Sequence, residues 1–214
     1  MVATVFLIDD DPSVRRALVR LIKSAGYQVE SFGSARDFLA REAGGSGAAC
    51  LVLDIRMPGL SGLDLQHELL AANVTLPIIF ITGHGDVPMS VKAMKAGAVD
   101  FLPKPVHEKD LLLAIEQALA RAVRDQAQRD ELESIQQRMQ KLTRREAEVM
   151  GLVVRGMLNK QIAFKLGTGE KTIKTHRARV MKKMQVASLA DLVRVAERAG
   201  IGKTSNSSPY RDTQ

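Results

Sequence analysis

Acidic side chains follow two apolar runs in the first quarter of the chain, where they could hold a cation or accept a phosphoryl group. The run 4–8 leads directly into Asp9 and Asp10, and the run 49–53 leads into Asp54. A short continuous apolar run rich in branched residues is typical of a strand that is covered on both faces of a parallel sheet. Ligands of open parallel sheets bind beyond the carboxyl ends of the strands, where these carboxylates stand.

A hydroxyl and a lysine end two further apolar segments. Thr82 closes the run 78–82, and Lys104 follows the segment 99–102. In one parallel sheet, both would join the acids at one edge. Mg²⁺ or Mn²⁺ prefers carboxylate and carbonyl oxygens, and a carboxylate beside such an ion can attack a phosphoryl group and hold it as an acyl phosphate. The lysine and the hydroxyl would neutralise and orient the transferred oxygens.

The elements that must position these side chains alternate between strand and helix. Patterns and turn residues predict strands at 4–8, 27–32, 49–54, 78–82 and 99–102, and helices at 12–26, 34–43, 62–72 and 86–97. A glycine-rich loop is predicted at 44–47. This alternation indicates an α/β fold with a parallel sheet and helices on both faces.

A long helix is predicted over 107–142, because this segment contains neither glycine nor proline. Two apolar stripes with helical spacing occur in it, one residue out of phase: Leu112, Ile115, Leu119 and Ala122, then Leu132, Ile135, Met139 and Leu142. A sustained coiled coil would keep its register. We interpret the segment as a last α/β-domain helix extended into a linker, and dimeric pairing along it stays open.

Three helices are predicted after the linker. Thr143 and Glu146 form a capping box that opens the first. Asn159 is expected to cap a short second helix, 160–166, and a glycine turn at 167–169 leads into a basic third helix, 170–184. A helix, a tight turn and a basic helix are typical of a helix-turn-helix.

The third helix divides into two faces. Ile173, His176, Val180 and Met184 form an apolar stripe, and the opposite side is small or polar with basic edges, as a helix in a DNA major groove needs. A solvated, lysine-rich face is the alternative interpretation. The candidate DNA-binding residues are Lys160, Lys171, Lys174, Thr175, Arg177, Ala178, Arg179 and Lys182.

Charge separates the two parts of the chain. Residues 1–142 hold 16 Lys and Arg against 18 Asp and Glu, whereas residues 143–204 hold 14 against 5. A nearly neutral module joined to a strongly basic one indicates an acidic site joined to a polyanion binder. We expect neither a membrane span nor a signal peptide, because no stretch of eighteen apolar residues occurs and the first segment is a predicted strand without a basic region before it. The single cysteine, Cys50, fits a reducing cytoplasm.

The first part resembles the receiver domains of two-component response regulators. The resemblance rests on the Asp-Asp pair, Asp-x-x-Met-Pro-Gly from Asp54, the Thr-Gly after a strand, and Phe-x-x-Lys-Pro from Phe101. It implies a flavodoxin-like, doubly wound five-stranded parallel sheet of order 2-1-3-4-5.

The receiver resemblance also implies a role for each site residue. Asp54 would be the phosphoacceptor, with Asp9, Asp10, Asp54 and the backbone carbonyl of Arg56 as ligands of Mg²⁺ (or Mn²⁺). Thr82 and Lys104 would contact the phosphoryl group, and Thr82 and Phe101 would switch on activation. Gly83 stands where many relatives have alanine.

The second part resembles the LuxR-type helix-turn-helix output domain. The matching stretches are Leu-Thr-x-Arg-Glu at 142–146, Asn-Lys-Gln-Ile-Ala at 159–163 and Lys-Thr-Ile-Lys-Thr-His-Arg at 171–177. With the receiver, this is the FixJ/NarL-type arrangement. Thr168 and Gly169 stand where relatives usually carry an apolar residue and serine.

The combined resemblance implies a domain organisation and a set of partners. We expect a receiver at 1–120, an extended last helix and linker at 107–142, a DNA-binding domain at 143–201 and a disordered tail at 202–214. The expected partners are a sensor histidine kinase, promoter DNA, RNA polymerase and a second copy of the phosphorylated chain, with no membrane. Two other hypotheses are a Mg²⁺-dependent phosphohydrolase and a scaffold that binds acidic proteins; Arg56 disfavours the first, since that enzyme class needs a second acid there.

Overall fold

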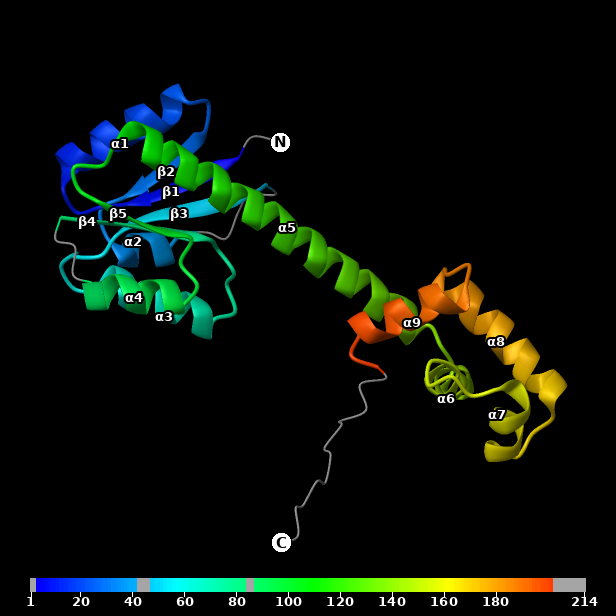
Figure 1. Cartoon of the computed structure of the whole chain (residues 1–214). Coiled ribbons are helices and arrows are strands. Elements are labelled where there is room, and N and C mark those ends of the chain that lie inside the picture. Colours follow the sequence, from blue (N-terminus) through cyan, green and yellow to red (C-terminus); the bar gives the residue numbers. More distant parts are fainter. Residues whose placement is uncertain (1–2, 42–46, 84–86, 202–214) are drawn as a thin grey trace, which may run out of the picture. The chain divides into compact units, whose positions relative to one another are not determined.

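The computed structural model describes residues 3–41, 47–83 and 87–201. The chain divides into two compact units, and the division falls between Gln126 and Ala127, inside helix α5 (Glu108–Gln140). Figure 1 labels the elements of both units. Among the described residues, no helix is long and apolar enough to cross a membrane.

A five-stranded parallel sheet is the centre of the first unit. Its strands are β1 (Thr4–Ile8), β2 (Gln28–Phe32), β3 (Ala49–Asp54), β4 (Ile78–Thr82) and β5 (Asp100–Pro103). Their order is β2-β1-β3-β4-β5, as predicted. Ile8 pairs with Leu53, and Thr82 pairs with Pro103. The register therefore aligns the carboxyl ends of the central strands at one edge.

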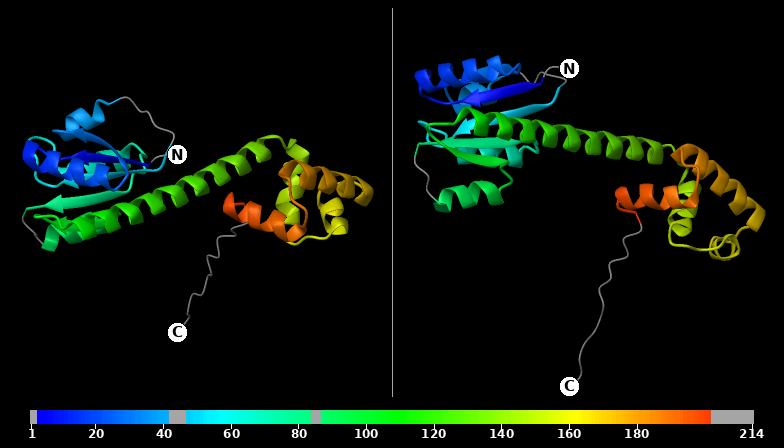
Figure 2. Two further views of the ribbon diagram at one scale, coloured as in Figure 1. Left: turned by 90° about the horizontal axis from the view of Figure 1, so that it is seen from above. Right: turned by 45° about the horizontal axis from the view of Figure 1, so that its top comes forward.

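Helices cover both faces of this sheet (Figures 1 and 2). Helix α1 (Pro12–Ser24) and the first part of α5 pack on one face, and α2 (Ala35–Leu39), α3 (Gly62–Ala71) and α4 (Val87–Lys95) pack on the other. Alternate strand residues divide between the two cores. Val5 and Leu7 point to the first, and Phe6 and Ile8 to the second. The α/β prediction is confirmed.

Helix α2 is shorter than predicted. Ser34, the first residue of the predicted helix, is the N-cap, because its hydroxyl accepts from the amide of Asp37, and the helix ends at Leu39. The next residues place Arg41 over the rings of Phe38 and Phe6, 3.9 and 4.6 Å from the ring centroids. Arg41 thus packs on the aromatic rings from a position beyond the end of the helix. Most of the predicted 44–47 loop, and Asp86 at the predicted start of α4, lie outside the described residues.

The two out-of-phase stripes of α5 have a structural explanation. In the first unit, Ile115 and Leu119 are buried against the sheet. In the second unit, Ile135 is buried in the other core, with Met139 and Leu142 packed against it. One helix thus contributes to two separate cores, and each core sets its own phase. Leu142 lies just beyond the end of the helix.

In the described part of the second unit, four helices follow α5: α6 (Arg144–Val153), α7 (Asn159–Lys165), α8 (Glu170–Met184) and α9 (Leu189–Arg198). The capping box of Thr143 and Glu146 is present. Helix α9 was not predicted, although Ser188 caps it by accepting from the amide of Asp191. That serine-to-acid spacing is the signal that could have found it. Leu192 and Ala196 complete the core.

The predicted cap of α7 was wrong by one residue. Leu158 is the N-cap and Asn159 is already helical. The Leu158 amide donates to Gln161 Oε1 at 2.8 Å, so a glutamine side chain satisfies an amide at the helix start. Asn159 is used differently, because its Oδ1 accepts from Arg177 Nη1 of α8 at 2.7 Å. A tertiary contact has replaced the local one.

Candidate functional site

Three strand ends converge on one acidic site. Asp9 follows β1, Asp54 ends β3 and Thr82 ends β4. All three are buried, with Asp9 and Thr82 at 0% and Asp54 at 5% exposure. Asp10 is exposed at the same place. The sheet thus brings together the residues that the strand-end pattern selected.

The carboxylates of Asp9, Asp10 and Asp54 form a cluster. One oxygen from each lies within 4.8 Å of the other two. Oxygen-only donors at this spacing fit a hard divalent cation that keeps several of its waters. This acidic triad is typical of the metal site of receiver domains. The residues present therefore fit Mg²⁺.

Lys104 joins two of these carboxylates. Its Nζ lies 2.7 Å from Asp9 Oδ2 and 2.5 Å from Asp54 Oδ2. Burial raises the pKa of Asp9, and the hydrogen bond and charge of Lys104 only partly offset this. Burial lowers the pKa of Lys104, but hydrogen bonds to Asp54 and Asp9 outweigh it, so its pKa is raised. The ammonium is thus held charged between the two acids.

The other oxygen of Asp54 is oriented from the turn that follows β3. Asp54 Oδ1 accepts from the Arg56 amide at 3.1 Å, so both carboxylate oxygens have a donor. Behind the acid, the Gly62 amide donates to Ile55 O at 3.0 Å. A Cβ at Gly62 would lie 2.4 Å from the Asp54 carbonyl oxygen. Only glycine allows α3 to start this close to the Asp54 backbone.

The loop after β1 is fixed by a residue that sequence reasoning missed. Arg15 Nη1 donates to Asp9 O at 2.5 Å and to Asp10 O at 3.3 Å. Asp11 caps α1 by accepting from the amides of Ser13 and Val14, and its own amide donates to Asp9 Oδ1. The position of Arg15 one turn into α1 is a weak signal, since helical arginines usually face solvent.

The remaining predicted receiver residues lie around this cluster. The Lys104 amide donates to Thr82 O at 2.7 Å, which ties the ends of β4 and β5 together. Phe101 is half-buried and packs against the core that contains Leu65 and Phe80. Gly83 is exposed, and a Cβ there would meet nothing within 4 Å. The predicted role of the Arg56 carbonyl as a ligand stays a prediction.

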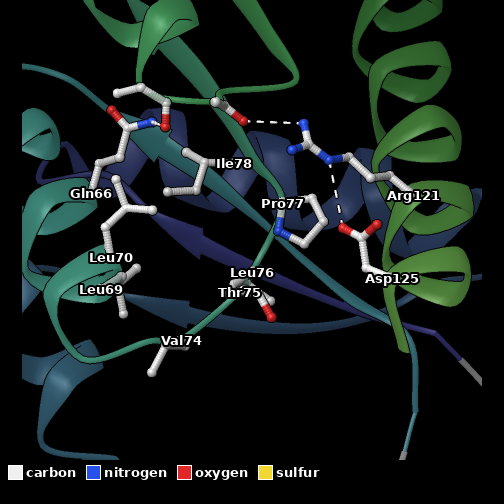
Figure 3. Close-up of a pocket in the computed structure, with 12 residues that line it drawn as sticks. Gln66, Leu69, Leu70, Val74, Thr75, Leu76, Pro77, Ile78, Arg121 and Asp125 are labelled. Carbon is white, nitrogen blue, oxygen red and sulfur yellow. Dashed lines mark hydrogen bonds and ion pairs between the residues drawn. The ribbon is translucent and has the colours of Figure 1, made fainter. Parts of the chain in front are cut away.

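A separate pocket of about 160 Å³ lies at the opposite edge of the sheet, where β4 begins (Figure 3). Arg121 donates to Gly97 O at 3.1 Å and pairs with Asp125 at 3.6 Å on its rim. Gln66 is 1% exposed, and its Oε1 has no partner among the described residues. None of the predicted site residues lines this pocket, so it is distinct from the acidic site.

Helix α8 presents the predicted faces. Ile173, Val180 and Met184 are buried, and His176 is half-buried. Six of the eight candidate DNA-binding residues are exposed on α8, and Lys160 is exposed on α7; the six are Lys171, Lys174, Thr175, Ala178, Arg179 and Lys182. Arg177 differs because it is half-buried and donates to Asn159. Its guanidinium therefore holds α7 to α8.

A buried carboxylate holds α6 to α8. Glu146 is 2% exposed and accepts from Lys183 Nζ at 2.6 Å and from the Thr143 amide at 2.9 Å. The hydrogen bond from Lys183, followed by that from the Thr143 amide, lowers the pKa of Glu146 to about 2. In the same unit, Arg138 Nη1 of α5 donates to Met184 O at 2.7 Å. These contacts attach the C-terminal end of α8 to α6 and α5.

Family comparisons match both units. Residues 5–116 match the response regulator receiver domain, and residues 140–196 match the bacterial regulatory proteins of the luxR family. Together the two matches span both the acidic cluster and the α6–α8 arrangement.

Individual relatives are similar over nearly the full length. Nodulation protein W of Bradyrhizobium diazoefficiens is 50% identical over 200 residues, covering 93% of this chain and 87% of that protein. Transcriptional regulatory protein FixJ of Rhizobium meliloti is 43% identical over 199 residues, covering 93% and 97%. The solved structure of response regulator StyR, 49% identical, has a TM-score of 0.80 and covers 92% of this chain and 100% of that chain.

Proposed function

The chain belongs to the two-component response regulators that join a receiver domain to a DNA-binding LuxR-type domain, and from this premise we propose that phosphorylation of Asp54 controls its binding to promoter DNA. The observation that carries the proposal is the contact of Lys104 with both Asp9 and Asp54 at the edge of the sheet. A receiver implies a kinase partner, and the helix-turn-helix implies DNA binding. The proposed donor is a sensor histidine kinase in the cytoplasm.

The proposed chemistry is transfer of a phosphoryl group to an Asp54 carboxylate oxygen. The oxygen attacks phosphorus, the bond from phosphorus to the donor nitrogen breaks, and the nitrogen keeps the electron pair. The Arg56 amide and Lys104 orient the carboxylate before reaction. Lys104 and the Thr82 hydroxyl would then neutralise and hold the phosphoryl oxygens.

The proposed cofactor is Mg²⁺, with Mn²⁺ as a substitute. When bound, it would neutralise charge on the phosphoryl oxygens. Asp9, Asp10 and Asp54, with the backbone carbonyl of Arg56, would hold it. Arg15 is a positioning residue in this proposal, because its guanidinium fixes the carbonyls of Asp9 and Asp10.

The proposed DNA contacts divide into two classes. Side chains at the centre of the exposed face of α8, such as Lys174 and Ala178, would meet base edges in the major groove. Basic residues at its margins, such as Lys182 and Lys160, would contact phosphates. RNA polymerase is the proposed further partner at the promoter. We also propose the domain limits 1–120, 107–142 and 143–201.

Coupling between the two functions is proposed to use dimerisation. The proposed surface lies near Val91, Lys95, Phe101 and Leu112. Helix α4 exposes Val91 and Lys95, and also Met94, whereas Phe101 on β5 and Leu112 on α5 are half-buried. Phosphorylation would repack Thr82 and Phe101 and create a dimer through this surface. A dimer gains affinity for adjacent half-sites by effective concentration, without any new DNA contact. Unmasking of α8 within one monomer is the competing mechanism.

Two other functions fit the chain less well. Membership in the response regulator transcription factors excludes a free-standing phosphohydrolase as the main activity. A scaffold for acidic proteins does not require small, exposed residues such as Ala178 between basic ones on α8, whereas base reading does.

The test combines chemistry and binding on the full chain. With Mg²⁺ and acetyl phosphate, Asp54 should gain an acid-stable, base-labile phosphoryl group, and affinity for the upstream region of its own gene should rise in a gel-shift series. Asp54→Asn should lose both effects and keep the basal affinity. Normal labelling of Asp54→Asn would refute the assignment of the acceptor.

A further inference from the structure

The outer face of α7 exposes apolar side chains at high accessibility. Phe164 is 91% exposed, and Leu158, which caps the helix, is 68% exposed. The inner face of the same helix buries Ile162 and Ala163 in the core. Scattered exposed apolar residues are ordinary. Here, however, five residues line one shallow pocket, which we call the α7 outer surface: Met157, Lys160, Gln161, Phe164 and Lys165.

This surface faces away from α8. The side chain of Asn159 marks the side of α7 that faces α8, because it accepts from Arg177. At about 100° per residue, Phe164 lies about 140° and Lys165 about 120° around the helix axis from Asn159. Phe164 and Lys165 therefore stay accessible while α8 occupies a DNA groove. Lys160, the proposed phosphate contact, lies about 100° from Asn159, between that side of the helix and Phe164.

The charge of the surface defines its partner. It contains no acidic residue and two lysines, of which Lys160 is the proposed phosphate contact and Lys165 is left for a partner. Glu170, at the start of α8, lies 3.8 Å from Lys174 and is thus directed to its own helix. DNA phosphates could pair with the lysines, but the DNA backbone offers no apolar group that would cover the Phe164 ring. A protein segment that carries both acidic side chains and an apolar side chain matches all of the surface.

We propose that the α7 outer surface binds an acidic protein segment of the transcription machinery, with Phe164 inserted against an apolar side chain of that segment. The inference rests on the proposed function, because the partner meets this surface only at a promoter. A patch built on one short helix makes a weak interface. DNA that holds both proteins would supply the effective concentration that makes such a contact useful.

The experiment is transcription in vitro by purified bacterial RNA polymerase holoenzyme, which is the probe. The template carries a DNA fragment selected for binding to the full chain, placed upstream of a core promoter. The full chain is treated with beryllofluoride. Phe164→Ala and Lys165→Glu should bind the fragment within twofold of the unchanged chain and yield at least tenfold less transcript. Leu132→Ala, which truncates another exposed apolar residue, should leave the transcript unchanged. A photoreactive benzoylphenylalanine at position 164 should crosslink to polymerase only on the DNA.

Four outcomes would overturn the proposal. If Phe164→Ala loses DNA affinity by as large a factor as it loses transcript, the surface binds nucleic acid. If the sedimentation of the treated Phe164→Ala variant differs from that of the treated unchanged chain, the surface binds a second copy. Unchanged transcript from both variants, despite normal folding by circular dichroism, would leave no partner there. If the unchanged chain neither binds DNA nor alters transcription, the proposed function fails and this inference fails with it.

Discussion

Lys104 Nζ lies 2.5 Å from Asp54 Oδ2 and 2.7 Å from Asp9 Oδ2, so one ammonium bridges acids at the ends of two neighbouring strands. Asp9 is fully buried, and removing a partner from a buried ion pair leaves an uncompensated charge. The position of this ammonium makes Lys104 both a structural counter-ion and the proposed phosphoryl contact.

Lys104→Ala should therefore lower thermal stability at pH 7 without Mg²⁺, and added Mg²⁺ should raise the Tm of the variant by more than that of the unchanged chain. The reason is that the cation replaces the lost positive charge. Phosphorylation of the variant should no longer increase DNA affinity. Lys109→Ala, an exposed lysine on α5, is the matched control; an identical Mg²⁺ response in all three proteins would contradict the prediction.

Gly62→Ala should destabilise the first unit by about 1–3 kcal/mol, because the new Cβ would lie 2.4 Å from the Asp54 carbonyl oxygen and 3.0 Å from Ile55 Cα. Both neighbours are backbone atoms that cannot rotate away. Gly83→Ala supplies the control, since a Cβ there meets nothing within 4 Å. Chemical denaturation would measure both, and equal stability of the two variants would show that the Asp54 turn can relax.

Glu146→Gln should reduce the dependence of stability on pH in acid. The pKa of Glu146 is lowered to about 2 from an ordinary 4.5, so its charge stabilises the folded chain above pH 4.5. That contribution is lost as the pH falls from 4.5 towards 2. At pH 7 the variant should lose about 1–3 kcal/mol of the free energy of unfolding. Parallel stability curves for both proteins between pH 5 and pH 3 would refute the role of this charge.

Lys174→Ala and Lys182→Ala should weaken DNA binding in different ways. If Lys174 reads a base, its loss should cost about 1–3 kcal/mol at a specific site and less on random DNA. Loss of Lys182 should weaken binding to all DNA similarly and reduce the salt dependence by about one charge. Titrations at several salt concentrations would separate them, and equal losses on both kinds of DNA would mean that the base-reading face is misassigned.

Beryllofluoride treatment should convert the full chain from monomer to dimer in sedimentation. Val91→Asp should prevent this, since it places a charge on an exposed apolar residue of α4. DNA affinity should fall together with dimerisation. A treated chain that stays monomeric, while residues 140–214 alone bind DNA far better than the untreated chain, would favour unmasking.

The sequence by itself determined the architecture of the first unit, because the three central strands, β1, β3 and β4, are short apolar runs, and Asp9, Asp54 and Thr82 stand at their ends. Parallel pairing then places Asp9, Asp54 and Thr82 at one edge without further information. The faces of α8 were equally predictable, since helical spacing separates Ile173 and Val180 from Lys174 and Ala178. In each case a local pattern repeats with the period of the element that it builds.

Tertiary structure decided what local pattern could not. Asn159 has the residue type of a cap, but it contacts Arg177, which lies 18 residues further along the chain. Gly62 is required only because α3 starts against the backbone of Asp54. The two phases of α5 follow from two cores, each of which selects its own face of one helix. These features depend on which surfaces meet, and neither propensity nor periodicity encodes the meeting of surfaces that are distant in sequence.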